Sequence, residues 1–161
     1  MVMTGMSMLG EVRPEHRHTP DGDLVLLHYL RSFRLPVLEV WSACTDRNQL
    51  SRWLGAVTGG GGNLTIEPSD GPVPGALAIR IDHCRAPHEL VLHVDGGLVE
   101  LAFNQVGVVT TVELVRRHLS PAAAAAMGPR WQYLLDRLTA YLQGEQLPRW
   151  SDYPKLTDEY H

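Results

Sequence analysis

Residues 31–54, RSFRLPVLEVWSACTDRNQLSRWL, constrain the fold more than any other part of the chain. The pattern predicts the end of a strand and then two short helices, separated by a break at Thr45-Asp46. Pro36 is tolerated in a first helical turn, because the amide that it lacks would have no partner there. Thr45 and Asp46 can cap the second helix, with Gln49 three residues after Asp46 as in a capping box. Helices this short are not stable alone, so they must brace a larger structure.

Strand patterns dominate the rest of the chain. A segment rich in apolar residues on both faces, 24–33, precedes the two helices, and alternating patterns follow them. These further strands are predicted over residues 64–67, 75–82, 90–94, 98–105 and 108–119. Asp95-Gly96-Gly97 is a tight hairpin signal, and the regular spacing of the strands predicts an antiparallel meander.

A long helix is predicted at the C-terminal side of the strands. Ser120 and Pro121 are suited to its cap and first turn, but Gly128-Pro129 should break or kink it, which leaves a main helix over about residues 129–143. Gly144 is the predicted stop. One stripe is apolar and consists of Trp131, Leu134, Leu135, Leu138 and Leu142. Other residues should face elsewhere, namely Arg130, Asp136, Arg137 and Gln143.

The order of these elements predicts an α+β domain in which a curved antiparallel sheet wraps around one long C-terminal helix. Sheet and helix each have one apolar face, and those faces should meet. The length of 161 residues favours a single domain. We expect a flexible N-terminal tail over residues 1–21, the folded domain over 22–144 and a C-terminal tail over 145–161.

A family resemblance rests on the same helical stretch. The residues that carry it are Arg31, Phe33, Pro36, Val40-Trp41, Thr45-Asp46, Leu50 and Trp53. Their spacing resembles the activator-of-heat-shock-ATPase-like (AHSA-type) branch of the START/SRPBCC superfamily. Residues 87–92, 110–115 and 131–142 resemble later strands and the C-terminal helix of that branch, so the likeness spans residues 22–144. The resemblance implies a START-like helix-grip fold and a ligand-binding or regulatory module with an internal apolar cavity. Because this fold carries many unrelated tasks, the resemblance is weak as a functional signature.

Composition excludes several classes of protein. The net charge of −4 argues against non-specific binding to nucleic acid. No apolar run approaches the length of a membrane span, and the N-terminus lacks the pattern of a signal peptide. Cys44 and Cys84 have no metal-type spacing and are predicted to be reduced, buried thiols. We therefore expect a cytoplasmic protein, either a monomer or a homodimer.

Neither a metal site nor a catalytic site stands out. His83, His88 and His93 cluster in the sequence, but they do not share one face, and a metal needs three or four converging ligands. No Gly-x-Ser-x-Gly elbow is present, and Glu100 and Glu113 are expected to point to solvent. The sequence thus predicts no metal, no cofactor and no catalytic residue.

The space between sheet and helix is the predicted binding site. A strongly curved sheet cannot touch a straight helix along its whole width, so an apolar pocket should remain. The predicted ligand-binding residues are Trp53, Leu77, Ile79, Leu101, Phe103, Leu114, Arg116, Trp131, Leu135 and Leu138. Trp53 should stand near the entrance. Arg116 should lie near one end, where it either meets an anionic ligand or extends to water.

Three functions remain open from the sequence. The first is a binding protein for an apolar or amphipathic small molecule, without chemistry of its own. The alternative is a protein-interaction module resembling the heat-shock ATPase activator domain, with a chaperone or another protein as its partner. The second alternative is a cyclase- or hydratase-like enzyme, which would need a polar pair inside the cavity. Only Arg116 and His93 are candidates for that pair.

Overall fold

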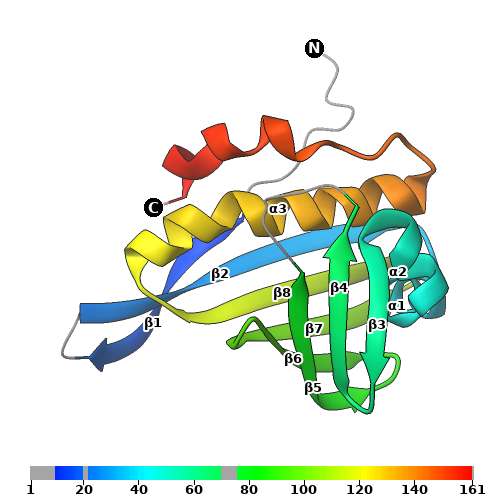
Figure 1. Cartoon of the computed structure of the whole chain (residues 1–161), viewed down its shortest axis with the longest axis horizontal. Helices are drawn as coiled ribbons and strands as arrows, with labels where there is room; N and C mark the ends of the chain where they lie inside the picture. Colours follow the sequence, from blue (N-terminus) through cyan, green and yellow to red (C-terminus); the bar gives the residue numbers. More distant parts are fainter. Residues whose placement is uncertain (1–9, 20–21, 70–75, 161) are drawn as a thin grey trace.

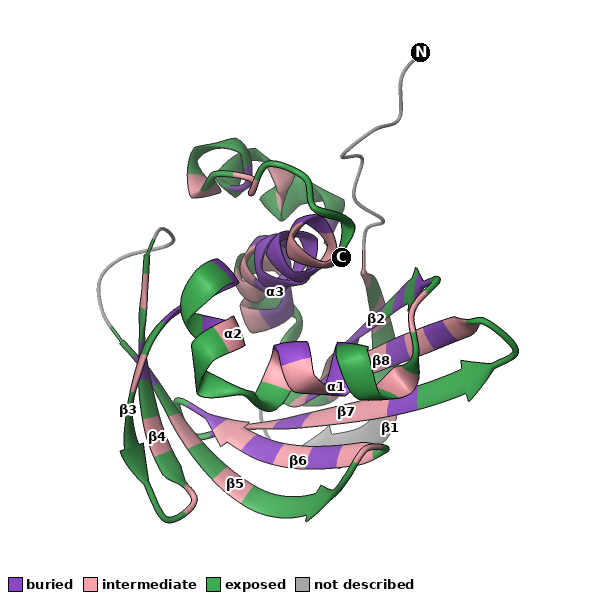
Figure 2. Ribbon diagram, turned by 90° about the vertical axis from the view of Figure 1, so that its right-hand side faces the viewer, coloured by how far each residue is buried: buried purple, intermediate pink, exposed green. Residues whose placement is uncertain are grey.

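An eight-stranded antiparallel sheet curves around one long helix in the computed structural model of the chain (Figure 1). The structure describes residues 10–19, 22–69 and 76–160. Viewed along α3, the sheet curves around one side of the helix, and the C-terminal segment covers the opposite side (Figure 2). The fold class is thus the α+β helix-grip architecture expected from the sequence.

The strand order in the sheet is β1-β2-β8-β7-β6-β5-β4-β3. The strands are β1 (Glu11–Thr19), β2 (Gly22–Phe33), β3 (Gly55–Gly60), β4 (Asn63–Pro68), β5 (Leu77–Arg85), β6 (Glu89–Val94), β7 (Gly97–Val106) and β8 (Val109–Leu119). The helices are α1 (Val37–Thr45), α2 (Arg47–Trp53) and α3 (Pro121–Gln143), followed by the 3-10 helices η1 (Trp150–Asp152) and η2 (Pro154–Glu159).

The sequential strands β3 to β8 form the predicted meander, and β2 closes against β8. Asp95 and Gly96 both have positive φ angles, 51° and 84°, as a tight two-residue hairpin requires. Gly61 and Gly62 form the turn between β3 and β4, and the two strands pair with each other on either side of it.

The two short helices are held by specific contacts to their neighbours. Asp46 caps α2, where its side chain accepts a hydrogen bond from the Asn48 amide at 2.8 Å. The predicted capping box is not completed by Gln49, because the Asp46 amide donates to the Ser42 carbonyl at 2.8 Å. The Gln49 side chain instead accepts a hydrogen bond from the Tyr141 hydroxyl at 3.1 Å. The brace is thereby tied to α3 as well as to the sheet.

The predicted break in the C-terminal helix is wrong, because α3 continues through Pro129. Ser120 and Pro121 do open the helix as expected, and the Ser120 hydroxyl accepts from the Ala123 amide at 3.1 Å. Tertiary contacts support the helix at the Gly-Pro step. The Tyr29 hydroxyl donates to the Gly128 carbonyl at 2.7 Å. The Tyr160 ring packs so closely that a Cβ on Gly128 would lie 2.2 Å from it.

Both chain ends contribute more structure than the sequence predicted. Residues 11–19, expected within a flexible tail, form β1 and pair with β2, while residues 1–9 and 20–21 lie outside the described residues. The C-terminal segment lies along the outer side of α3, with Tyr153 and Tyr160 buried. Asp136 and Arg137 were predicted to face away from the core. They are buried because this segment covers them.

Candidate functional site

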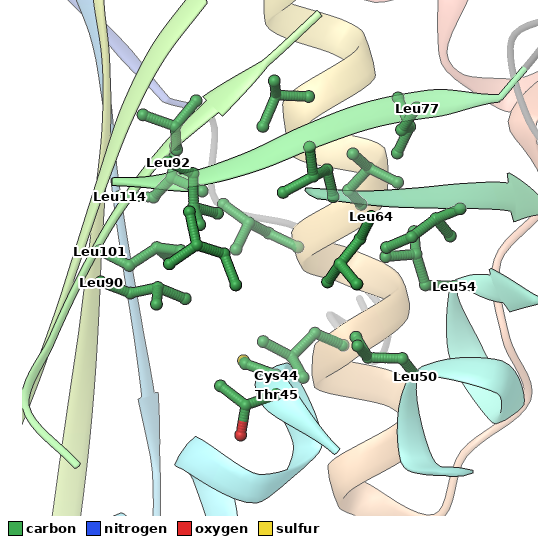
Figure 3. A pocket seen from close by; sticks show the side chains of 18 of the residues that line it. Cys44, Thr45, Leu50, Leu54, Leu64, Leu77, Leu90, Leu92, Leu101 and Leu114 are labelled. Atoms are coloured by element: carbon green, nitrogen blue, oxygen red, sulfur yellow. The ribbon is translucent and has the colours of Figure 1, made fainter. Parts of the chain in front are cut away.

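An apolar cavity of about 290 Å³ lies between the inner face of the sheet, α3 and the two brace helices. Its wall has three parts, whose side chains point into a common space (Figure 3). Strands β4 to β8 supply Leu64, Ile66, Leu77, Ile79, Ile81, Cys84, Leu90, Leu92, Val94, Val99, Leu101 and Leu114, and Ala86 follows β5. Helices α1 and α2 supply Trp41, Cys44, Thr45, Leu50 and Trp53, and Leu54 follows them. Helix α3 supplies Trp131, Leu134, Leu135 and Leu138.

Most of the predicted binding residues line this cavity. They are Trp53, Leu77, Ile79, Leu101, Leu114, Trp131, Leu135 and Leu138. Phe103 does not, because its ring packs edge-on against Trp41, with 5.1 Å between the ring centroids. Arg116 does not line the cavity either, and its position is described below. The wall geometry therefore agrees with eight of the predicted positions, while their role in binding stays a prediction.

Sequence reasoning missed the cysteine-bearing part of the wall. Cys84 was expected to be buried, but it is exposed and lies where β5 ends against the cavity. The pairing register between β5 and β6 shifts between Ile81 and His83. Such an irregularity changes which residues face inward, so Cys84 joins Ile81 on the cavity side. No pattern in the sequence marks that shift.

Trp53 is fixed at both its ring and its backbone. Its indole N–H donates to the Ala43 carbonyl at 2.9 Å, which holds the ring between the two brace helices. Its carbonyl accepts from Arg137 Nε at 2.6 Å. The other two guanidinium nitrogens of Arg137 donate to the Pro148 carbonyl at 3.0 Å and to Ser69 Oγ at 3.1 Å. Arg137 therefore connects the cavity wall to α3, to the end of β4 and to the C-terminal segment.

Arg116 lies on the inner face of β8, just beyond the end of the cavity. It pairs in register with Val99, and Leu114 is its neighbour on the same face; both of these line the cavity. The guanidinium lies over Gly97, where a Cβ would come within 2.1 Å of it, and donates to the Arg117 carbonyl. Arg116 is only 9% exposed, and this desolvation lowers the pKa of its guanidinium.

Polar chemistry inside the cavity is sparse. The Thr45 hydroxyl donates to the Trp41 carbonyl at 2.9 Å, which leaves the hydroxyl oxygen free to accept. Cys44 is half-buried against the cavity, and removal from bulk water raises the pKa of its thiol to about 12. The Cys44 thiol is therefore protonated and a poor nucleophile at neutral pH. The wall presents no acid–base pair.

The histidines and carboxylates that the sequence singled out are engaged elsewhere. His93 contacts Asp82 at 2.6 Å and Arg80 at 3.0 Å, and His93 is absent from the cavity wall. Glu113 pairs with His28 at 2.6 Å. In the described residues, no group of three or more His, Cys, Asp or Glu side chains is arranged to hold a metal ion. Nor does this part of the chain contain a helix long and apolar enough to cross a membrane.

A second hollow lies on the outer side of the brace helices, with a volume of about 520 Å³. It is wider open than the inner cavity and includes polar side chains. Its lining residues are Leu35, Leu38, Glu39, Ser42, Gln49, Tyr141 and Leu142. Leu38 is 64% exposed, so part of this hollow is an apolar surface in contact with solvent.

Comparison with solved structures places the fold among known relatives. CalU16 from Micromonospora echinospora superimposes with a TM-score of 0.69 at 25% identity, covering 95% of this chain and 94% of CalU16. DynU16, described as a protein in the dynemicin biosynthetic locus, superimposes with a TM-score of 0.66 at 21% identity, covering 78% of this chain and 49% of DynU16. The AHSA1-like protein from Aeromonas hydrophila superimposes with a TM-score of 0.57 at 20% identity, covering 73% of this chain and 92% of that protein. The comparison with curated proteins found no match.

Comparison with protein families assigns the chain to one family. The family described as "Activator of Hsp90 ATPase homolog 1-like protein" matches residues 34–143. This range begins just before α1 and ends with the last residue of α3, so it includes both brace helices, the meander and the gripped helix. The chain therefore belongs to the Activator of Hsp90 ATPase homolog 1-like family.

Proposed function

We propose that this protein binds a small apolar or amphipathic molecule in the cavity between the sheet and α3. The observation that carries the proposal is the cavity itself, whose wall is almost entirely hydrocarbon. Its volume of about 290 Å³ lies just below the usual range for ligand sites, roughly 300–1,000 Å³. Wall atoms that border this space lack part of the packing contacts that core atoms normally make, which costs stability. A bound apolar molecule offsets that cost by restoring contacts to the wall.

An environment-sensitive apolar dye tests the proposal. We expect wild-type protein to bind it with micromolar-class affinity, about −8 kcal/mol. Leu135 projects into the cavity from α3 and is 5% exposed, so Leu135→Trp should fill the space and abolish binding. Gln143→Trp adds the same ring at an exposed position of the same helix and serves as the matched control. Absence of dye binding in wild type, or binding that survives Leu135→Trp unchanged, would contradict the proposal.

The second candidate is a protein-interaction module. It is favoured by three large apolar side chains that face solvent, namely Leu38, Val106 and Val108, which are 64%, 73% and 61% exposed. The Val37 amide donates to Gln105 Oε1 at 2.9 Å, which brings the start of α1 beside the end of β7. If the dye does not bind, stimulation of a heat-shock ATPase becomes the test to perform. Leu38→Asp should then abolish the stimulation.

An enzymatic role receives less support. A cyclase or hydratase needs a donor and an acceptor placed against the substrate inside the cavity. Among the described residues, the polar side-chain groups of the wall are the Thr45 hydroxyl, the thiols of Cys44 and Cys84, and the indole N–H groups of Trp41, Trp53 and Trp131. Arg116 and His93, the candidates from the sequence, both lie outside that wall.

A further inference from the structure

Three arginines are buried in the described part of the chain, and they differ in how well their donors are satisfied. Arg31 is 6% exposed and forms an ion pair with Asp136 at 3.2 Å. Arg137 is 5% exposed and donates to three separate oxygens. Arg116 is 9% exposed, yet its hydrogen bond goes to a single backbone carbonyl, that of Arg117. Because a guanidinium carries five N–H donors, Arg116 is by far the least satisfied of the three.

No carboxylate within the described residues forms an ion pair with Arg116. The acidic residue of the adjacent β6–β7 turn, Asp95, is engaged elsewhere. It accepts from the Ala78 amide at 2.9 Å and from Arg130 at 3.2 Å. A buried charge without a counter-charge is costly, and proteins usually pair it. Arg116 is thus a largely buried cation with no carboxylate partner among the described residues, and its nitrogens without a protein partner remain accessible.

The position of this cation is informative because it adjoins the cavity. Val99 and Leu114, its neighbours on the inner face, are part of the cavity wall. Gly97 lies under the guanidinium and provides the room that a side chain would occupy. Among the described residues, the cavity wall contains no charged side chain. The head group of an anion at this end would therefore find one charged donor, and the rest of the molecule would lie against a mostly hydrocarbon wall.

We propose that the ligand of this cavity is an amphipathic anion, with an apolar body among the leucines and a carboxylate-like head group paired with Arg116. This inference rests on the proposed function and specifies the class of its ligand. The lowered pKa of Arg116 agrees with a site that water solvates poorly, where a charge-assisted hydrogen bond is strong.

Decanoate and decan-1-ol are suitable probes, because they share an apolar chain and differ in the charge of the head group. Binding is followed at pH 8, where the acid is ionised, through the fluorescence of Trp41, Trp53 and Trp131 in the cavity wall. We expect wild type to prefer decanoate over decanol. Arg116→Met should weaken decanoate binding roughly tenfold to a hundredfold, the range for a hydrogen bond to a charged group, and leave decanol binding unchanged.

Two further variants separate charge from structure. Arg117→Gln removes a positive charge from the next residue, whose side chain pairs with Glu100, and should leave the preference for decanoate intact. Arg116→Lys should retain part of that preference. Without ligand, Arg116→Met should be at least as heat-stable as wild type, because an unpaired buried charge has been removed.

The outcomes distinguish this inference from the proposed function. Equal affinity of wild type for decanoate and decanol overturns the amphipathic anion and leaves the apolar binding site standing. The inference also fails if Arg116→Met lowers the melting temperature sharply and keeps the preference for decanoate, since the residue would then be structural. If neither probe binds, and the apolar dye does not bind either, both proposals fail together.

Discussion

The two sides of α3 differ in how completely they are packed. On the side of the sheet, Trp131, Leu135 and Leu138 face a cavity of about 290 Å³. On the opposite side, the C-terminal segment covers the helix (Figure 2), and side-chain hydrogen bonds join the two. The Tyr153 hydroxyl donates to Asp136 at 2.6 Å, and the Tyr160 hydroxyl donates to Gln132 at 2.7 Å.

The difference suggests that the two sides of α3 serve different purposes, ligand binding on one side and stabilisation of the fold on the other. A side that keeps an open apolar space gives up packing contacts, which makes it suited to receiving a ligand. The tightly packed side compensates for these lost contacts, because its side chains are buried and its polar groups are hydrogen-bonded. Substitutions on the packed side should therefore lower the free energy of unfolding. Substitutions on the cavity side should lower it less, and their main effect should be on ligand binding.

The largest effect is expected at the ion pair between Arg31 of β2 and Asp136 of α3, which is joined to the C-terminal segment through Tyr153. Asp136→Ala leaves Arg31 as a buried charge without a partner and also removes the acceptor of Tyr153. Loss of one member of a buried pair costs about 3–5 kcal/mol, so we expect that decrease in the free energy of unfolding, measured in urea. Asp158→Ala, at an exposed position of the same segment, is the control and should change little. A loss below about 1 kcal/mol for Asp136→Ala would contradict the expected difference in stability cost between packed and cavity-lining positions.

The same truncation at a fully packed core position and at a cavity position provides the next comparison. Leu27 is fully buried on β2 and absent from the cavity wall, whereas Leu135 lines the cavity. Leucine-to-alanine changes in cores cost about 2–5 kcal/mol. We expect Leu27→Ala near the upper end and Leu135→Ala near the lower end, because Leu135 already borders empty space. Equal costs, measured by thermal or urea unfolding, would mean that the cavity side is packed as tightly as the rest.

A smaller effect is expected at Gly128. A methyl group there would lie 2.2 Å from the Tyr160 ring, so Gly128→Ala must displace the C-terminal segment. We expect a loss of about 1–3 kcal/mol, despite the higher helix propensity of alanine. Faster cleavage by chymotrypsin after Trp150 or Leu156, which lie in the same segment and are not followed by proline, should accompany it. Gain of stability in this variant would show that the segment packs loosely.

The smallest effect concerns the thiol in the cavity wall. The raised pKa of Cys44, about 12, means that the folded state holds this proton longer than the unfolded state. The contribution of Cys44 to stability is therefore present at neutral pH and is lost as the pH rises from about 9 towards 12. At pH 8, a maleimide should modify the exposed Cys84 at least about a hundredfold faster than Cys44, as measured by mass spectrometry. Equal rates would place Cys44 in bulk water instead of the cavity wall.

Sequence patterns were sufficient for the elements whose signals are local. The alternation of 90–94 and the Asp95-Gly96 turn predicted the β6–β7 hairpin, and Ser120-Pro121 predicted the start of α3. The apolar stripe of α3, the alternating strands and the second brace helix also placed eight of the ten predicted positions on the cavity wall. These predictions succeed because side-chain direction follows directly from the period of a regular helix or strand.

Only the tertiary structure decided the features that depend on distant partners. β1 lacks a strong pattern of its own and is a strand because it pairs with β2. The helix continues through Gly128-Pro129 because Tyr29 and Tyr160 hold it there. The register shift in β5 turned Cys84 towards the cavity, and the Arg116 guanidinium lies over Gly97, at the end of the cavity. In each case the free energy comes from contacts between residues far apart in the chain, which a local pattern does not encode.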